Sequence, residues 1–333
     1  MMLYNNFMKK FRVISDLHLD INSSSPIGFD DDVFTLICGD TSGDPSLSIN
    51  WIKSNIKNGL VISGNHLPYN SKNLTMQELR SELETAFPKD GPITYLDAEC
   101  QTFFKEVDGI LFVGTCMYSD MRISTRYNPD GQKELNMHKA ARSMNDYHFG
   151  IISKTHPFGA DNYPHYQHMT PADYVKWFGN AFVKIDKLLT ENEAKEKPLP
   201  VVLLTHFPLI KDILSHSYYV DPDNYASYGS DRCDWLLSHP SIKCYCCGHA
   251  HMVDKNFKNY LLPRDDGTAI RVVSNTRGYL HSWHDKEFNK NTFVNTDDWT
   301  VTVEPETEEE AKAKQERYKS FEELMKLSSA FIC

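Results

Sequence analysis

Short apolar runs that end at a polar residue recur along this chain and predict strands buried in a core. The runs of this kind lie at 11–15, 33–38, 60–63, 201–204 and 242–247. A hairpin is predicted where 103–107 and 110–113 flank Asp108-Gly109, and a further strand is predicted at 270–274. Strands are therefore expected in both the N-terminal and the C-terminal parts of the chain.

Segments with a helical spacing of apolar residues, or with helix-start signals, lie between these strands. They are 45–57, 75–87, 132–146, 170–189 and 231–237. Thr75 with Glu78 makes a capping-box pattern, and Thr170 followed by Pro171 is typical of a helix start. Because strands and helices alternate, we predict a largely parallel α/β core whose ligand site lies at the carboxyl ends of the strands. The polar strand ends are then expected on one edge.

Composition narrows the class of protein. The 333 residues, 41% hydrophobic and 24% charged, suit a globular protein of one large domain or two ordinary ones, and we predict a single domain over 1–333. The net charge of −10 lacks the basic footprint of a nucleic-acid binder, so a nucleic-acid partner is not favoured. The sequence contains no apolar stretch long enough for a membrane span and no secretory signal, and its eight cysteines lie mostly in strand-like surroundings. A cytoplasmic protein with reduced thiols and no membrane partner is expected.

The residues at the strand ends carry the candidate chemistry. They are Asp16-Leu17-His18, Gly39-Asp40, Gly64-Asn65-His66, Thr205-His206 and Gly248-His249-Ala250-His251. Mixed oxygen and nitrogen ligands suit Mn, Fe, Zn or Co better than Ca, which prefers oxygen alone. Ligands two residues apart on extended backbone point the same way, and the glycines are expected to let the backbone turn where the ligands begin.

These five motifs, in the order D-x-H, G-D, G-N-H, H and G-H-x-H, span residues 16 to 251. In this order they resemble the calcineurin-like metallophosphoesterase superfamily. The resemblance implies an α/β fold (α+β in some schemes), a four-layer αββα sandwich of two mixed sheets. It also implies a cofactor of two divalent or trivalent metal ions, with Mn expected first and Fe, Zn, Mg or Co as alternatives.

The resemblance also implies a role for each matching residue. The metal ligands would be Asp16, His18, Asp40, Asn65, His206, His249 and His251. Asp16, His18 and His251 would hold one metal. Asn65, His206 and His249 would hold the other, and Asp40 would bridge the two. Asn65 and His66 would contact the phosphate, and His66 would protonate the leaving oxygen.

The implied reaction is hydrolysis of a small phosphorylated substrate, a phosphodiester or phosphomonoester that could be nucleotide-like. A metal-activated water would attack in line with the leaving oxygen. The two alternatives are a nuclease acting on DNA or RNA and a catalytically weak metal-binding scaffold that recruits a partner protein.

Two departures from the family pattern matter. Many members carry an acidic residue after G-N-H that can orient the catalytic histidine, and this chain has Leu67 there. The stretches around Asp40 and His66 also lack the arginines of the Ser/Thr phosphoprotein phosphatase branch, which argues against that branch.

Two segments extend the predicted core. Residues 117–200 lie between the strand at 110–113 and His206, so we predict a helical and loop cap over the metals, with 145–147 as candidate contacts. Residues 305–333 are rich in Glu and Lys and predict a charged, helical C-terminal tail.

Overall fold

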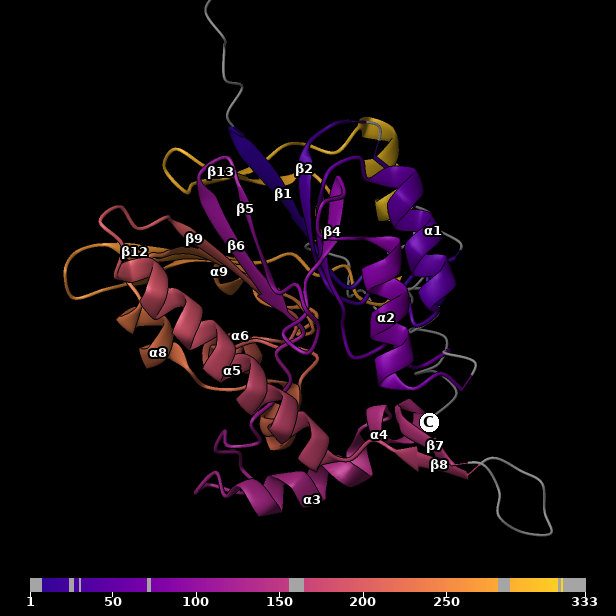
Figure 1. Cartoon of the computed structure of the whole chain (residues 1–333). Coiled ribbons are helices and arrows are strands. Elements are labelled where there is room, and N and C mark those ends of the chain that lie inside the picture. The colour runs from indigo at the N-terminus through magenta and orange to yellow at the C-terminus, as the bar shows by residue number, and fades with distance from the viewer. Residues whose placement is uncertain are drawn as a thin grey trace, which may run out of the picture.

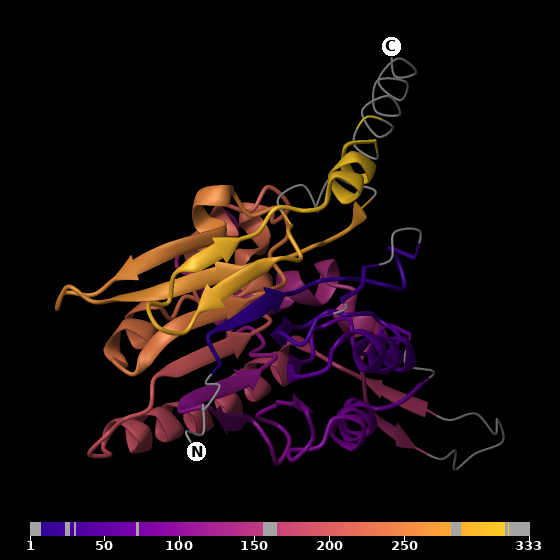
Figure 2. The ribbon, with the colours of Figure 1, turned by 90° about the horizontal axis from the view of Figure 1, so that it is seen from above.

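Two six-stranded mixed sheets form the centre of the fold in the computed structural model (Figure 1). The structure describes residues 8–23, 27–29, 31–70, 73–155, 165–280, 288–316 and 319. The first sheet has the order β14-β13-β1-β2-β3-β4, and the second has the order β11-β12-β10-β9-β6-β5. Strands β1 to β4 run parallel, as do β6, β9, β10 and β12, while the remaining pairings are antiparallel. The C-terminal strand β13 lies beside β1 (Figure 2).

The strands of the first sheet are β1 Lys10–Ile14, β2 Phe34–Cys38, β3 Gly59–Ile62, β4 Ile93–Tyr95, β13 Thr292–Asn295 and β14 Val301–Val303. Those of the second sheet are β5 Phe104–Val107, β6 Ile110–Thr115, β9 Val201–Thr205, β10 Ile242–Cys247, β11 Asn259–Pro263 and β12 Ala269–Ser274. A separate hairpin pairs β7 Ile151–Thr155 with β8 His165–His168.

The alternation of side chains along the strands builds the layers. Val13 of β1 and Val202 of β9 belong to one buried cluster, which fills the space between the sheets. Their neighbours Ile14 and Leu203 point the other way and join the clusters under the outer helices. Strands buried on both faces need apolar residues at every position, which explains the continuous apolar runs in the sequence.

The outer layers are helical. On the first sheet lie α1 Pro45–Asn55 and α2 Met76–Ala86, and on the second lie α5 Pro171–Glu193 and α8 Cys233–Ser238 (Figure 1). Thr75 forms the predicted capping box of α2, and Thr170 is the N-cap of α5, directly before Pro171, as predicted. Short helices complete the connections: α6 Lys211–Ser215, η1 Pro222–Asn224, α7 Tyr225–Tyr228 and α9 Lys255–Lys258. Among the described residues, no helix combines the length and apolar character that a membrane crossing requires.

The predicted four-layer sandwich of two mixed sheets is confirmed. The prediction of one sheet edge for all the polar strand ends is wrong, because three of these strands lie in the first sheet and β9 and β10 lie in the second. Periodicity could not divide the strands between two sheets, since fully buried strands in either sheet have the same apolar pattern. The sequence pattern also missed the edge strands β4, β11 and β14, the strand β13 next to β14, and the hairpin of β7 and β8.

The predicted cap, 117–200, contains two kinds of structure. Helices α3 Lys133–Ser143 and α4 Asp146–Phe149 and the hairpin of β7 and β8 lie beyond the carboxyl ends of the strands (Figure 1). Helix α5 instead packs on the outer face of the second sheet, where Ile185 and Leu189 are fully buried. The boundaries of the cap stay a prediction. In the predicted tail, 308–316 is helical, and residues from 320 onward lie outside the described part.

A buried ion pair joins α2 to the segment after β4, and its further contacts reach α5 and the second sheet. Arg80 donates through Nε to Asp97 Oδ2 at 3.2 Å, and its guanidinium lies 4.5 Å from the centre of the Trp177 ring. Asp97 also accepts hydrogen bonds from the hydroxyls of Tyr95 and Thr115. A charge removed from this network leaves its partner buried without compensation, which is costly.

We therefore expect Arg80→Ala to lower the free energy of unfolding by about 3–5 kcal/mol. Urea or thermal unfolding measures the change. The control is Lys187→Ala, which breaks only the exposed pair with Glu191 and should cost less than about 0.5 kcal/mol. Equal effects of the two substitutions would contradict the role given to Arg80.

Candidate metal centre

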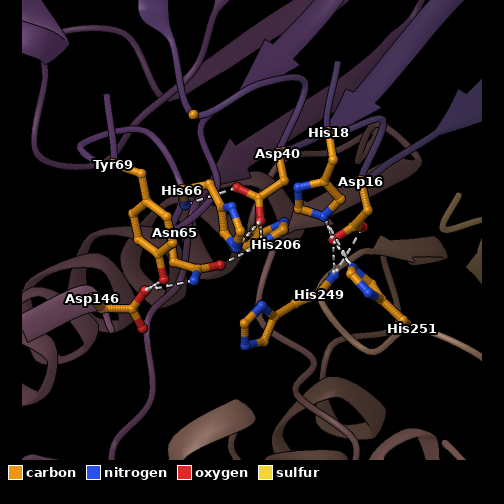
Figure 3. Close-up of polar contacts among 12 residues, drawn as sticks. Asp16, His18, Asp40, Asn65, His66, Tyr69, Asp146, His206, His249 and His251 are labelled. Carbon is orange, nitrogen blue, oxygen red and sulfur yellow. Dashed lines mark hydrogen bonds and ion pairs between the residues drawn. The ribbon is translucent and has the colours of Figure 1, made fainter. Parts of the chain in front are cut away.

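The polar strand ends of both sheets converge on one site (Figure 3). Asp16 and His18 follow β1, Asp40 follows β2, and Asn65 and His66 follow β3. From the second sheet, His206 follows β9, and His249 and His251 follow β10. All eight side chains are buried, and the most exposed is His66, at 8%. The structure thus brings together every residue that the sequence motifs singled out.

The first ligand group consists of Asp16, His18 and His251. Asp16 Oδ1 lies 3.0 Å from His251 Nε2 and 3.8 Å from His18 Nε2, and the two Nε2 atoms are 3.2 Å apart. Asp16 also accepts the backbone N–H of His249. This last bond connects the loop after β1 to the loop after β10, so the carboxylate joins the two sheets.

The second ligand group consists of Asp40, His206 and His249. Asp40 Oδ2 and Asn65 Oδ1 lie 3.2 Å and 3.0 Å from His206 Nε2. The other ring nitrogen of His206, Nδ1, lies 2.8 Å from the carbonyl oxygen of Cys38 and can donate to it. That bond leaves Nε2 turned toward the oxygen atoms of the site.

Asp40 also belongs to a third group, with His18 and His66. Asp40 therefore lies next to His18 of the first ligand group as well as next to His206 and His249 of the second. Its Oδ1 accepts the backbone N–H of His66 at 3.0 Å, and its Oδ2 lies 3.9 Å from His66 Nε2. A residue in this place can contact two cations and hold the G-N-H loop at the same time.

Four of the candidate ligands have a left-handed backbone conformation. Asp16, His18, Asp40 and His249 have φ values of 55°, 44°, 48° and 63°. Glycine was expected to supply these turns, but of the three motif glycines only Gly39, with φ 95°, has a positive φ. At Gly64 the requirement is space, because a Cβ there would lie 1.9 Å from Asp40 Oδ1.

The two carboxylates are ionised despite their burial. Burial alone would raise the pKa of Asp16, but the hydrogen bond with His251 and the charge of His206 hold that pKa well below its usual range. Burial likewise opposes ionisation of Asp40, and the charges of His206 and His66 lower its pKa. The site therefore holds fixed negative charge and favours a cation.

The imidazoles divide into neutral and charged groups. Burial lowers the pKa of His18 and of His249, which keeps both rings neutral and able to offer a lone pair. Burial also disfavours charge on His206, but Asp40 and Asp16 overcome this effect and raise its pKa to about 9. Without a cation, a proton on His206 balances part of the negative charge.

These residues fit a pair of metal ions. His18 Nδ1 and His249 Nε2 are buried without a hydrogen-bond partner, a costly arrangement for a polar atom. Two carboxylates, four imidazoles and one amide oxygen are a donor set typical of Mn, Fe, Zn or Co. Two buried anions, with the neutral rings of His18 and His249 beside them, are stabilised when cations bind.

Aromatic residues hold His66 where the family pattern would place an acid. Leu67 is buried in the core beneath α2. The ring of His66 instead stacks on Tyr69, with ring centres 4.1 Å apart, and its Nε2 lies 3.3 Å from the hydroxyl of Tyr279. Ring stacking and one hydroxyl therefore fix the plane of the imidazole in this chain.

The site opens into a cavity of about 420 Å³. Its walls include Tyr69, Phe149, Tyr219, Tyr228 and Tyr279, together with Asp146 from the predicted cap. Asp146 Oδ1 accepts hydrogen bonds from Asn65 Nδ2 and from the Tyr69 hydroxyl, while burial raises the pKa of this carboxyl. Sequence reasoning named 145–147 only as candidate contacts and missed the tyrosines, because lone aromatic residues carry no spacing signal.

Metal binding should stabilise the protein. We expect Mn²⁺ at a hundredfold excess over its dissociation constant to raise the free energy of unfolding by about 2.7 kcal/mol over chelator-treated protein. Thermal unfolding with and without Mn²⁺ measures this. Ca²⁺ is the matched control and should stabilise less, because imidazole nitrogens suit it poorly. Identical melting curves with Mn²⁺ and with chelator would contradict the metal centre.

Comparisons with known proteins agree with this geometry. No protein with curated annotation matches the sequence. The phosphopantetheinyl hydrolase PptH of Mycobacterium tuberculosis has a similar fold, with a TM-score of 0.58 at 15% identity over 90% of this chain and 98% of that one. The sequence model of the calcineurin-like phosphoesterase family (Metallophos) matches residues 9–253, which include every ligand described above. The chain therefore belongs to the calcineurin-like phosphoesterase family and is a metal-dependent hydrolase.

Proposed function

We propose that this phosphoesterase hydrolyses a small, nucleotide-like phosphoester at a two-metal centre, with His66 as the proton donor. The observation that carries the proposal is the position of Asp40, which is grouped with His206 and His249 on one side and with His18 on the other, and which also holds the loop of His66. A carboxylate between two candidate cation sites, 3.9 Å from a histidine that lines the same cavity, suits transfer of a phosphoryl group to water.

The ligands divide between the two cations. Asp16, His18 and His251 would hold one, while Asn65, His206 and His249 would hold the other. Asp40 lies next to residues of both sets and would serve both cations. When bound, the two cations supply Lewis-acid stabilisation of the phosphoryl oxygens and lower the pKa of the attacking water. The neutral state of His18 and His249 keeps their lone pairs available for this purpose.

His66 supplies the proton. Its ring lines the cavity on the side of Asp40, and Tyr69 and Tyr279 fix its orientation. A protonated imidazole can give a proton to a leaving oxygen within hydrogen-bond reach. Asn65 lies beside it on the same loop and lines the same cavity.

The cavity supports a small substrate with an aromatic or extended group. Its volume, about 420 Å³, is in the range of small-molecule sites. The tyrosine and phenylalanine rings on its walls can pack against a planar base. Among the described residues that line it, none is a lysine or an arginine, which favours a singly charged diester over a doubly charged monoester. The structural neighbour is named for a phosphopantetheinyl substrate, which supports an extended phosphoester here.

The compartment of the proposed reaction is the cytoplasm. The described cysteines are free thiols, and those on the strands are buried. Free thiols persist in reducing compartments, so this arrangement supports the placement.

The proposed function is tested with Mn²⁺-loaded protein on bis-p-nitrophenyl phosphate and p-nitrophenyl phosphate. Hydrolysis of the diester should exceed that of the monoester because the cavity offers little further positive charge. A protein that binds Mn²⁺ but hydrolyses neither ester, nor a panel of cyclic and linear nucleotides, would overturn the proposal.

The role of His66 is tested by His66→Ala. We expect kcat to fall by about 10²–10⁴ on phenyl phosphodiesters, while both Mn²⁺ ions stay bound, because general acid catalysis contributes a factor of this size. His138→Ala, an exposed histidine on α3, is the control and should leave kcat unchanged. A loss of Mn²⁺ in His66→Ala would make His66 a ligand instead, as its position near His18 and Asp40 allows.

A further inference from the structure

The side-chain amide of Asn65 has two ends of similar shape and opposite chemistry. Its Oδ1 can bind a cation, whereas its Nδ2 carries only donors and repels one. In the structure Oδ1 faces the Nε2 atom of His206, at 3.0 Å, and Nδ2 faces away. Some other group must hold the amide in this orientation, because a flip by 180° would point the NH₂ group into the metal site.

Asp146 is the group that meets the far end of this amide. Its Oδ1 accepts a hydrogen bond from Asn65 Nδ2 at 2.7 Å. Asp146 is only 1% exposed, and its second oxygen, Oδ2, is buried without a hydrogen-bond partner. Since a carboxylate oxygen pairs with the NH₂ end and not with the carbonyl end, this contact selects one orientation of Asn65.

The same oxygen also reaches the proton donor indirectly. Asp146 Oδ1 accepts a second hydrogen bond, from the hydroxyl of Tyr69 at 2.5 Å. Tyr69 in turn stacks on His66, at 4.1 Å between ring centres with the planes 21° apart (Figure 3). One carboxylate therefore fixes both a proposed metal ligand and the ring that supports the proposed acid.

We propose that Asp146 is a positioning residue that sets the orientation of the Asn65 amide for the metal and, through Tyr69, the plane of the His66 ring. The inference rests on the proposed function for the second part only. Asp146 connects α4, which lies between the strands β6 and β9 in sequence, directly to the metal centre. Its carboxyl group takes over the orienting role of the acid that many family members carry after G-N-H.

A packing role alone predicts a different result. If Asp146 only anchored α4, its replacement would lower the stability of the protein, but folded protein would bind metal and turn over normally. Metal affinity and leaving-group dependence therefore separate positioning from packing.

The first experiment is isothermal titration of Mn²⁺ into the full chain carrying Asp146→Ala or Asp146→Asn. We expect one of the two Mn²⁺ ions to bind about 10–100-fold more weakly in Asp146→Ala, as is usual when a group that orients a ligand is lost. Asp146→Asn keeps the shape and one acceptor, so a smaller loss is expected, and it remains informative if Asp146→Ala does not fold. Glu134→Gln, an exposed acid on α3, is the control.

The second experiment compares p-nitrophenyl and phenyl phosphodiesters, because the poorer leaving group needs the proton from His66 more. We expect Tyr69→Phe, which loses the bond to Asp146, to reduce kcat more on the phenyl ester, with KM and Mn²⁺ affinity unchanged. Asp146→Ala should show both defects.

Wild-type Mn²⁺ affinity in both folded Asp146 variants would overturn the inference. Equal losses on the two esters in Tyr69→Phe would overturn its second part. An unsubstituted protein that hydrolyses neither ester would overturn the proposed function instead, and the titration would still decide the role of Asp146 toward Asn65.

Discussion

The burial of two ionised carboxylates, Asp16 and Asp40, is the constraint on which the site depends. Each is almost fully enclosed, at the point where the carboxyl ends of two sheets meet. A buried charge without a partner is expensive, and here the compensation comes from imidazoles of the opposite sheet. His206 and His251 therefore do two things: they offset the buried charge, and they align the second sheet with the first.

This alignment has a cost in the backbone. Four ligand residues adopt left-handed φ values, at about 1–2 kcal/mol each for a residue with a side chain. Strain of this kind persists where the surrounding structure determines the conformation more strongly than the local preference does. The apolar layer between the sheets, with Val13 and Val202 fully buried, provides that support. The packed apolar core thus holds the strained residues after the strands in place, and these residues carry the candidate metal ligands.

The sequence predicted those parts of the molecule that local patterns control. Buried strands such as β9 and capped helices such as α2 follow from period and capping chemistry, and the ligands follow from motifs at strand ends. The division into two sheets did not follow from pattern alone, because it depends on strand pairing across long separations. Edge strands such as β14 are half-exposed and lack a clear apolar signal. Tyr69 and Asp146 lie 77 residues apart, so only the fold could reveal their contact.

Leu67 stands where many family members have an acid that orients the catalytic histidine, so other residues must orient His66 in this chain. In this chain the position after His66 faces the apolar core under α2, where a carboxylate would be buried without a partner. The orientation of His66 instead depends on rings that contact it, and the carboxyl group of Asp146 on α4 accepts a hydrogen bond from one of them, Tyr69. Aromatic stacking is weaker than a charged hydrogen bond but fixes the ring plane well. The same carboxylate also faces Asn65, so a residue of the connecting segment becomes part of the metal centre, and the segment and the strand ends act as one unit.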